Sequence, residues 1–209
     1  MDKVILNVED IERLLKWRDE HPEEVRSHPA PLKAVEIVLP HNGYRIKGIR
    51  AGNRLRLHLS QNYDQLGHCE FVRRIDGMWA SVKNRMKVDE DGLRSVLTVY
   101  CSLMALMAFG RAERETGTEV KEKVAHKPSK KPSSKPKQRT TYILRMDNGT
   151  LLAAPSGSHA SPRGIFSVRG HYRHYKSGKV VWIAEYKKGT GKKKAKTYKM
   201  GGKSDEPKR

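Results

Sequence analysis

A helical pattern of apolar residues near the middle of the chain limits the possible folds more than any other feature. From residue 93 to 109, apolar side chains recur every three or four positions, namely at Leu93, Val96, Leu97, Tyr100, Leu103, Met104 and Met107. Acidic residues at 89–91 favour a helix N-terminus, and Gly110 is a natural C-cap. The later turns are apolar almost all round, so we expect burial against a sheet, or against a second copy in a homodimer through residues 93–109.

The segments before this helix predict the strands of a sheet. Residues 34–39 form an apolar run, and residues 44–50 and 54–59 alternate in polarity on either side of a turn at 51–53. A second hairpin crosses Asp76-Gly77, which is a strong two-residue turn signal. Residues 1–112 are therefore predicted to form an α+β domain, a mainly antiparallel sheet packed on one long apolar helix.

One face of the 44–59 hairpin is basic. Its outward positions carry Arg45, Lys47, Arg54, Arg56 and His58, and its inward positions are apolar. A solvated sheet face is one interpretation, although such faces usually mix the signs of charge. Because these two strands carry no acidic residue on that face, we also consider it a candidate nucleic-acid surface.

The composition changes after residue 112. Residues 127–137 are all Lys, Pro or Ser, so this segment has no apolar surface to offset the entropy lost on ordering. We predict a disordered basic linker at 113–139, a small basic all-β unit at 140–200 and a frayed tail at 201–209.

Positive charge is concentrated in the last third of the chain. Residues 141–209 hold 16 Lys+Arg against 4 Asp+Glu, and so carry +12 of the net charge of +20. A field of this size favours a polyanion, meaning nucleic acid or an acidic membrane surface. Aromatic residues lie among the cations, which favours nucleic acid, RNA or DNA, over a membrane.

A hairpin at 165–186 combines rings and cations most densely. Its turn is predicted at 176–179, with Gly178 free to take positive φ. The apolar residues Phe166, Val168, Val181 and Trp182 are expected to form the small core that holds the hairpin. The remaining cations and rings are expected to contact phosphates and bases: Arg169, His171, Arg173, Tyr175, Lys176, Lys179, Lys187, Lys192, Lys193 and Lys194.

The sequence favours binding over catalysis. His171 and His174 lie three apart and would point to opposite faces of a strand, and no C-x-x-C pair exists. Glu185 and Lys187 could share a face in a metal-dependent nuclease, but no convincing second acid accompanies them. We expect no catalytic residue, no metal and no cofactor. The N-terminus has no signal-peptide pattern, and the nearly charge-free stretch 95–110 is short for a bilayer, so a cytoplasmic location is expected.

The stretch Val168–Ile183 resembles a short C-terminal module, R-G-H-[WY]-R-x-Y-x-S-G-K-x-V-W-[VI], of uncharacterised proteins from phages and other mobile elements. Some proteins with similar basic modules resemble inhibitors of bacterial defence, including anti-CRISPR proteins. The resemblance implies a phage or mobile-element origin and a bacterial host cytoplasm. It leaves two functions open: direct nucleic-acid binding, or inhibition of a host defence ribonucleoprotein complex.

Overall fold

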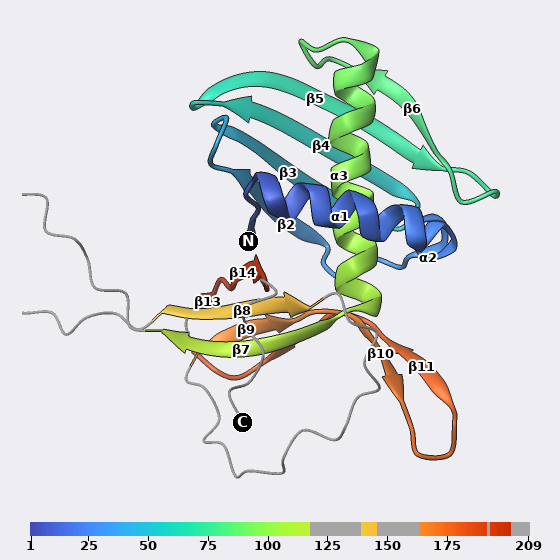
Figure 1. Cartoon of the computed structure of the whole chain (residues 1–209), viewed down its shortest axis with the longest axis vertical. Helices are drawn as coiled ribbons and strands as arrows, with labels where there is room; N and C mark the ends of the chain where they lie inside the picture. Colours follow the sequence, from blue (N-terminus) through green and yellow to red (C-terminus); the bar gives the residue numbers. More distant parts are fainter. Residues whose placement is uncertain (118–138, 146–163, 192, 202–209) are drawn as a thin grey trace, which may run out of the picture.

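The computed structural model describes residues 1–117, 139–145, 164–191 and 193–201 (Figure 1). In these residues, nine strands form one mixed sheet in the order β6-β5-β4-β3-β2-β1-β14-β8-β7. Strands β2 (Ala34–Leu39), β3 (Tyr44–Ala51), β4 (Arg54–Gln61), β5 (Asp64–Arg73) and β6 (Trp79–Asn84) form an antiparallel meander. The α+β fold with a mainly antiparallel sheet on one long helix is confirmed.

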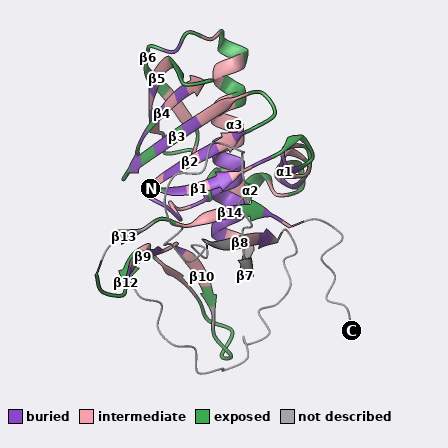
Figure 2. Ribbon diagram, turned by 90° about the vertical axis from the view of Figure 1, so that its left-hand side faces the viewer, coloured by how far each residue is buried: buried purple, intermediate pink, exposed green. Residues whose placement is uncertain are grey.

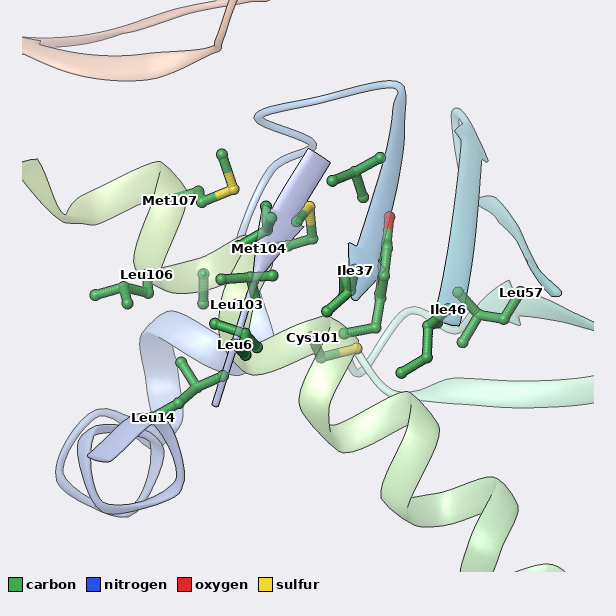
Figure 3. Packing of buried hydrophobic residues seen from close by; sticks show 14 of the residues in the cluster. Leu6, Leu14, Ile37, Ile46, Leu57, Cys101, Leu103, Met104, Leu106 and Met107 are labelled. Atoms are coloured by element: carbon green, nitrogen blue, oxygen red, sulfur yellow. The ribbon is translucent and has the colours of Figure 1, made fainter. Parts of the chain in front are cut away.

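Helices cover one face of this sheet in two layers (Figure 1, Figure 2). The long helix α3 (Glu90–Phe109) lies against the sheet, and α1 (Val8–Glu20) and α2 (Pro22–Ser27) lie over α3. Residues Tyr100 to Ala108 are all buried, because α3 is covered by strands on one side and by Leu14 of α1 on the other (Figure 3). This explains why its sequence is apolar all round.

The expected homodimer through residues 93–109 stays a prediction. Most of the surface of that helix is already buried against other elements of the same chain. The first turns of α3, before Tyr100, and its last residue, Phe109, remain partly exposed. The helix also begins earlier than the apolar stretch at 95–110, and its 20 residues have a mean hydropathy of 1.5 in the most apolar window. By length and composition it could therefore cross a membrane, a property that core helices of soluble proteins share.

The C-terminal strands join the sheet of the N-terminal domain. β14 (Thr197–Met200) lies between β1 (Asp2–Ile5) and β8 (Arg139–Arg145) and is parallel to both. β7 (Arg111–Gly117) then pairs antiparallel with β8 at the sheet edge. This differs from the boundaries expected at 112 and 140: strands on both sides of residues 113–139 form one sheet, and the chain is still extended and paired at 113–117. The rest of the predicted linker, 118–138, and the predicted tail at 202–209 lie outside the described residues.

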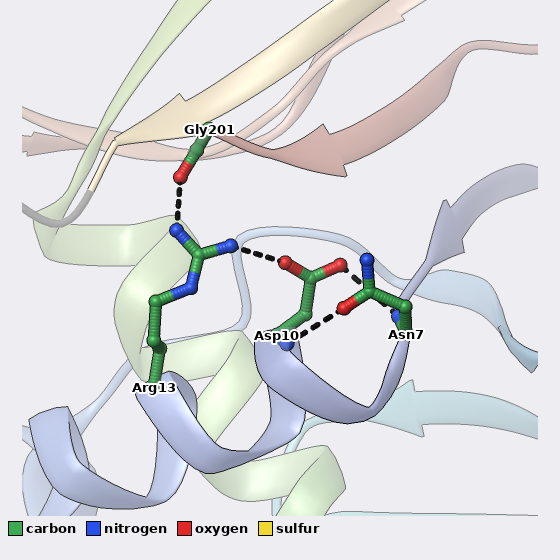
Figure 4. Close-up of polar contacts among 4 residues, drawn as sticks. All are labelled: Asn7, Asp10, Arg13 and Gly201. Carbon is green, nitrogen blue, oxygen red and sulfur yellow. Dashed lines mark hydrogen bonds and ion pairs between the residues drawn. The ribbon is translucent and has the colours of Figure 1, made fainter. Parts of the chain in front are cut away.

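Polar contacts of α1 hold the end of this C-terminal segment (Figure 4). Asn7 caps the helix by accepting from the Asp10 amide over 2.8 Å, and Asp10 accepts in return from the Asn7 amide over 3.0 Å. Asp10 also pairs with Arg13, whose second terminal nitrogen donates to the Gly201 carbonyl oxygen. The cap of the first helix is thus linked to the residue that follows β14.

The remaining strands form two small sheets beside the large one. β10 (His171–His174) pairs with β11 (Val180–Ile183), and β9 (Ile165–Val168) pairs with both β12 (Tyr186–Lys188) and β13 (Lys193–Lys194). The predicted hairpin at 165–186 is therefore present. It is interrupted once on each arm, between β9 and β10 and between β11 and β12.

Candidate nucleic-acid interface

The β10–β11 hairpin projects beyond the C-terminal end of α3 (Figure 1). Its turn is closed by two backbone hydrogen bonds, from the Tyr175 amide to the Lys179 carbonyl and from the Gly178 amide to the Tyr175 carbonyl, each 2.9 Å long. Gly178 has φ of +81°, as predicted, and a side chain is disfavoured there. The turn therefore places Lys176 and Lys179 at the exposed end of the hairpin.

The base of the hairpin packs on the core helix. The Tyr172 ring stacks on Phe109 at 4.9 Å between centroids, and the Trp182 ring contacts Tyr172 edge-on at 5.0 Å. Gly170 donates its amide to the Pro31 carbonyl over 2.7 Å. Trp182 is thus a packing residue, as expected, and the hairpin is held in one orientation relative to α3.

Arg169 does not lie on an exposed contact face, and this corrects the prediction for that residue. Its Nη2 donates to the Gly110 carbonyl oxygen over 2.9 Å, at the end of α3 where a cation is favoured by the helix dipole. Its Nη1 is buried without a hydrogen-bond partner among the described residues, and burial lowers the pKa of the guanidinium. Arg169 lies between the end of β9 and the start of β10, and its side chain reaches the end of α3 instead of continuing the outward row of β10.

The side chain of His171 is only partly accessible to a nucleic acid. Its Nδ1 lies 3.1 Å from the Arg169 carbonyl oxygen, and its side chain is half-buried. Of the three residues predicted on the polar face of the first arm, Arg173 is the one that is exposed.

The exposed end of the hairpin forms a compact cationic patch. Its four residues, which we call the hairpin-tip patch, are Arg173, Tyr175, Lys176 and Lys179. The Arg173 guanidinium lies over the Tyr175 ring at 5.0 Å from its centroid, and Tyr175 is 41% exposed. No carboxylate of the described residues forms an ion pair with these cations. The patch offers both free positive charge and an accessible ring.

The other predicted contacts of this region are Lys187, Lys192, Lys193 and Lys194. Lys187 is exposed on β12 beside Tyr186, which is also exposed. Lys193 and Lys194 form β13, but their side chains are not among the described ones, and Lys192 lies outside the described residues. These lysines stay predictions.

The basic stripe of the first domain lies on the sheet face away from α3, as the alternation predicted. Ile46, Leu55, Leu57 and Leu59 are buried under the helix, and the residues between them point outward. We call the outward group the open-face patch: Arg45, Lys47, Arg54, Arg56 and His58. Register places Lys47 opposite His58 and His58 opposite His68, so the patch runs across β3 and β4 and borders His68 of β5.

The open face carries more acid than predicted. Glu36 of β2 pairs with Lys3 at 3.5 Å and with Arg45 at 3.4 Å, and Glu70 of β5 pairs with Arg56 at 2.8 Å. These acids come from the flanking strands, which the alternation of β3 and β4 did not include. Lys47 and Arg54 remain exposed and form no ion pair with any described residue.

Two residues of this face escaped the sequence analysis. His68 lies beside His58 with 5.4 Å between ring centroids, and partial burial, His68 and the neighbouring cations lower the pKa of His58. Tyr63, in the β4–β5 turn, is 82% exposed and has the Arg45 guanidinium 5.2 Å from its ring centroid. An aromatic residue in the tight turn between two alternating strands was the signal that could have identified it.

Glu185, one of the two residues considered for a nuclease, has a structural contact. Glu185 accepts a hydrogen bond from the Lys33 amide over 2.7 Å, which links β11–β12 to the segment before β2. Cys69 and Cys101 are buried free thiols, and burial raises the pKa of Cys101 to about 12. Among the described residues, no three His, Cys, Asp or Glu side chains lie together as metal ligands would.

Comparison of the chain with protein-family models, curated proteins and solved structures found no match.

Proposed function

We propose that this protein is a non-enzymatic nucleic-acid-binding protein that holds RNA or single-stranded DNA through the hairpin-tip patch. The observation that supports this most is the arrangement of Arg173 over the exposed ring of Tyr175, next to Lys176 and Lys179. Lysine and arginine supply affinity for phosphates, and an exposed ring stacks on an unpaired base. Both groups lie at the end of one projecting hairpin.

The rigidity of the hairpin supports the proposal. Stacking of Tyr172 on Phe109 and the hydrogen bond from Gly170 to Pro31 fix its base on the core. The patch is therefore preorganised, and binding does not have to order the hairpin first. Its cations form no ion pair with the described residues, so none of those contacts has to be broken when a phosphate binds.

A single strand fits this patch better than a duplex. In a duplex the bases are stacked on each other and only their edges are accessible, so a protruding tyrosine gains little. In a single strand the base can leave its neighbours and stack on the ring. The proposal includes both RNA and DNA, because neither the ring nor the cations recognise the 2′-hydroxyl.

The direct test is fluorescence anisotropy with a labelled RNA and a labelled DNA strand of the same sequence. The wild-type protein is expected to bind both at about 50 mM salt and to lose affinity steeply towards 200 mM. Replacing Arg173 by Gln and Tyr175 by Ala should weaken binding about tenfold or more, whereas Lys16→Gln on α1 should not. No binding at 50 mM salt would contradict the proposal, as would cleavage of the strand with Mg²⁺ or Mn²⁺ present.

The alternative of a defence inhibitor uses the same patch. There, the cations would occupy a groove of a host ribonucleoprotein complex that normally holds RNA or DNA, or would contact its guide RNA. It predicts tight binding to the assembled complex and weak binding to free strands. The anisotropy experiment, repeated with a purified bacterial effector complex, therefore separates the two functions.

A further inference from the structure

The turn between β4 and β5 contains an unusual residue. Its two central positions, Asn62 and Tyr63, have φ of 48° and 77°, both in the left-handed region. Two-residue hairpin turns of this kind favour Asn or Asp followed by Gly, because a side chain at the second position is disfavoured there. Asn62 fits this preference and Tyr63 does not, so the tyrosine is held in a strained backbone conformation.

Packing does not explain why a tyrosine occupies this position. The side chain is 82% exposed, so it adds little to the core. Within the described residues, its ring contact is with Arg45, whose guanidinium carbon lies 5.2 Å from the ring centroid. A residue that strains the backbone and buries little surface points to a role outside the folding of the chain.

The surroundings of the ring indicate its partner. Arg45 belongs to the open-face patch and is held by Glu36 at 3.4 Å, so its guanidinium is oriented beside the tyrosine. Along the same face, Lys47 and Arg54 are exposed and form no ion pair with a described residue. An accessible ring at the end of a row of cations is the arrangement that binds single-stranded nucleic acid without sequence preference.

We propose that Tyr63 stacks on an unpaired nucleobase and that the open-face patch is a second binding surface for single-stranded nucleic acid. This inference rests on the proposed function of the protein but uses a surface separate from the hairpin-tip patch. Phosphates of the strand contact Lys47 and Arg54, and the base reaches the ring of Tyr63 beside Arg45. A protein partner is disfavoured because the face presents a row of cations that ends at one ring and not a continuous apolar area.

Two ring-deleting substitutions separate this role from a structural one. Tyr63→Gly and Tyr63→Asn both suit the positive φ, so each variant should melt at the wild-type temperature or above it. Each should also bind a labelled single strand about fivefold or more weakly in anisotropy measurements. Tyr63→Phe retains the ring and should bind as the wild type does.

The binding results for the Tyr63 variants can be told apart from those for the Arg173 and Tyr175 variant of the hairpin. Wild-type affinity for a single strand in Tyr63→Gly and Tyr63→Asn would overturn this inference, and would leave the ring for a protein partner. The proposed function would then still stand if the Arg173 and Tyr175 variant bound weakly. A wild-type protein that bound no strand would overturn both. Weakened binding of a fully paired duplex to the same extent as a single strand would also contradict base stacking.

Discussion

The guanidinium of Arg169 donates a hydrogen bond to the carbonyl oxygen of Gly110 over 2.9 Å. The two residues are far apart in the sequence, and the contact joins the base of the hairpin to the end of the core helix. Arg169 and Arg173 therefore have different roles, although both lie in the same basic motif. Arg169 is half-buried, with its Nη1 enclosed at the end of α3, and Arg173 is exposed beside Tyr175.

This difference predicts unequal losses of stability for two alanine substitutions. Arg169→Ala leaves the Gly110 carbonyl without its partner and should lower the free energy of unfolding by about 1–3 kcal/mol. Arg173→Ala, at an exposed site, should change it by less than about 0.5 kcal/mol. Urea unfolding followed by circular dichroism measures both. Equal stability of the two variants would show that the Arg169 contact contributes nothing to the fold.

Gly170 lies too close to Trp182 to accept a side chain. A Cβ at this position would be 2.5 Å from Cζ2 of the indole ring. Gly170→Ala should therefore displace the hairpin base and destabilise the protein by about 1–3 kcal/mol, which thermal unfolding would detect.

The matched control for this substitution is Gly178→Asn, in the turn of the same hairpin. No atom lies within 4 Å of a Cβ built there, so the cost is that of the positive φ alone, which Asn tolerates better than most residues. Its melting temperature should fall less than that of Gly170→Ala. A larger loss at Gly178 than at Gly170 would contradict the packing described for the hairpin base.

The salt dependence of binding should report the lysines of the hairpin-tip patch. If Lys176 and Lys179 each neutralise a phosphate, replacing both by Gln should reduce the slope of log K against log salt by about 1.4 for a single strand. The control is Lys16→Gln with Arg94→Gln, which removes the same charge from the exposed surfaces of α1 and α3. An equal change of slope in both variants would mean that only net charge matters.

Stability should fall in mild acid because of His28. Burial, together with the nearby Arg50 and Arg73, lowers the pKa of this histidine from 6.5 to about 4, against a hydrogen bond to the Pro29 carbonyl that raises it. The folded protein keeps the ring neutral, so between pH 6.5 and 4 the unfolded chain binds the extra proton. The stabilisation is complete above pH 6.5 and is lost as the pH falls towards 4, by at most roughly 1 kcal/mol per pH unit.

Chemical denaturation at several pH values would test this prediction. His28→Gln should flatten the dependence in that window, whereas His41→Gln, at an exposed site, should leave it unchanged. A wild-type free energy of unfolding that rises from pH 6.5 to 4 would have the wrong sign for a buried neutral histidine.

Patterns among neighbouring residues correctly predicted several strands, the long helix and a turn. The alternation of residues 54–59 correctly identified the buried Leu55, Leu57 and Leu59, since side chains of a strand alternate between its faces. The spacing of apolar residues identified α3, and the turn at Gly178 has the expected positive φ. Each of these features depends on residues that are neighbours in the sequence.

Long-range contacts could not be predicted in this way. The parallel pairing of Val4 with Tyr198 has no local signal, because it depends on which strand happens to reach the free edge of β1. The position of the Arg169 side chain depends on the carbonyl of Gly110. The acidic residues that pair with cations of the open-face patch, Glu36 and Glu70, lie on β2 and β5 and not on the basic strands β3 and β4. Tyr63 was missed because its strain is visible only in the backbone dihedral angles.

The most direct test of the central claim is to locate the strand on the protein. A single-stranded oligonucleotide with photoreactive bases, bound at low salt and irradiated, should crosslink at Tyr175 of the hairpin-tip patch, as identified by mass spectrometry of the digested protein. Unlabelled single strand should compete for the crosslink. Efficient crosslinking with no adduct in residues 173–179 would contradict the account.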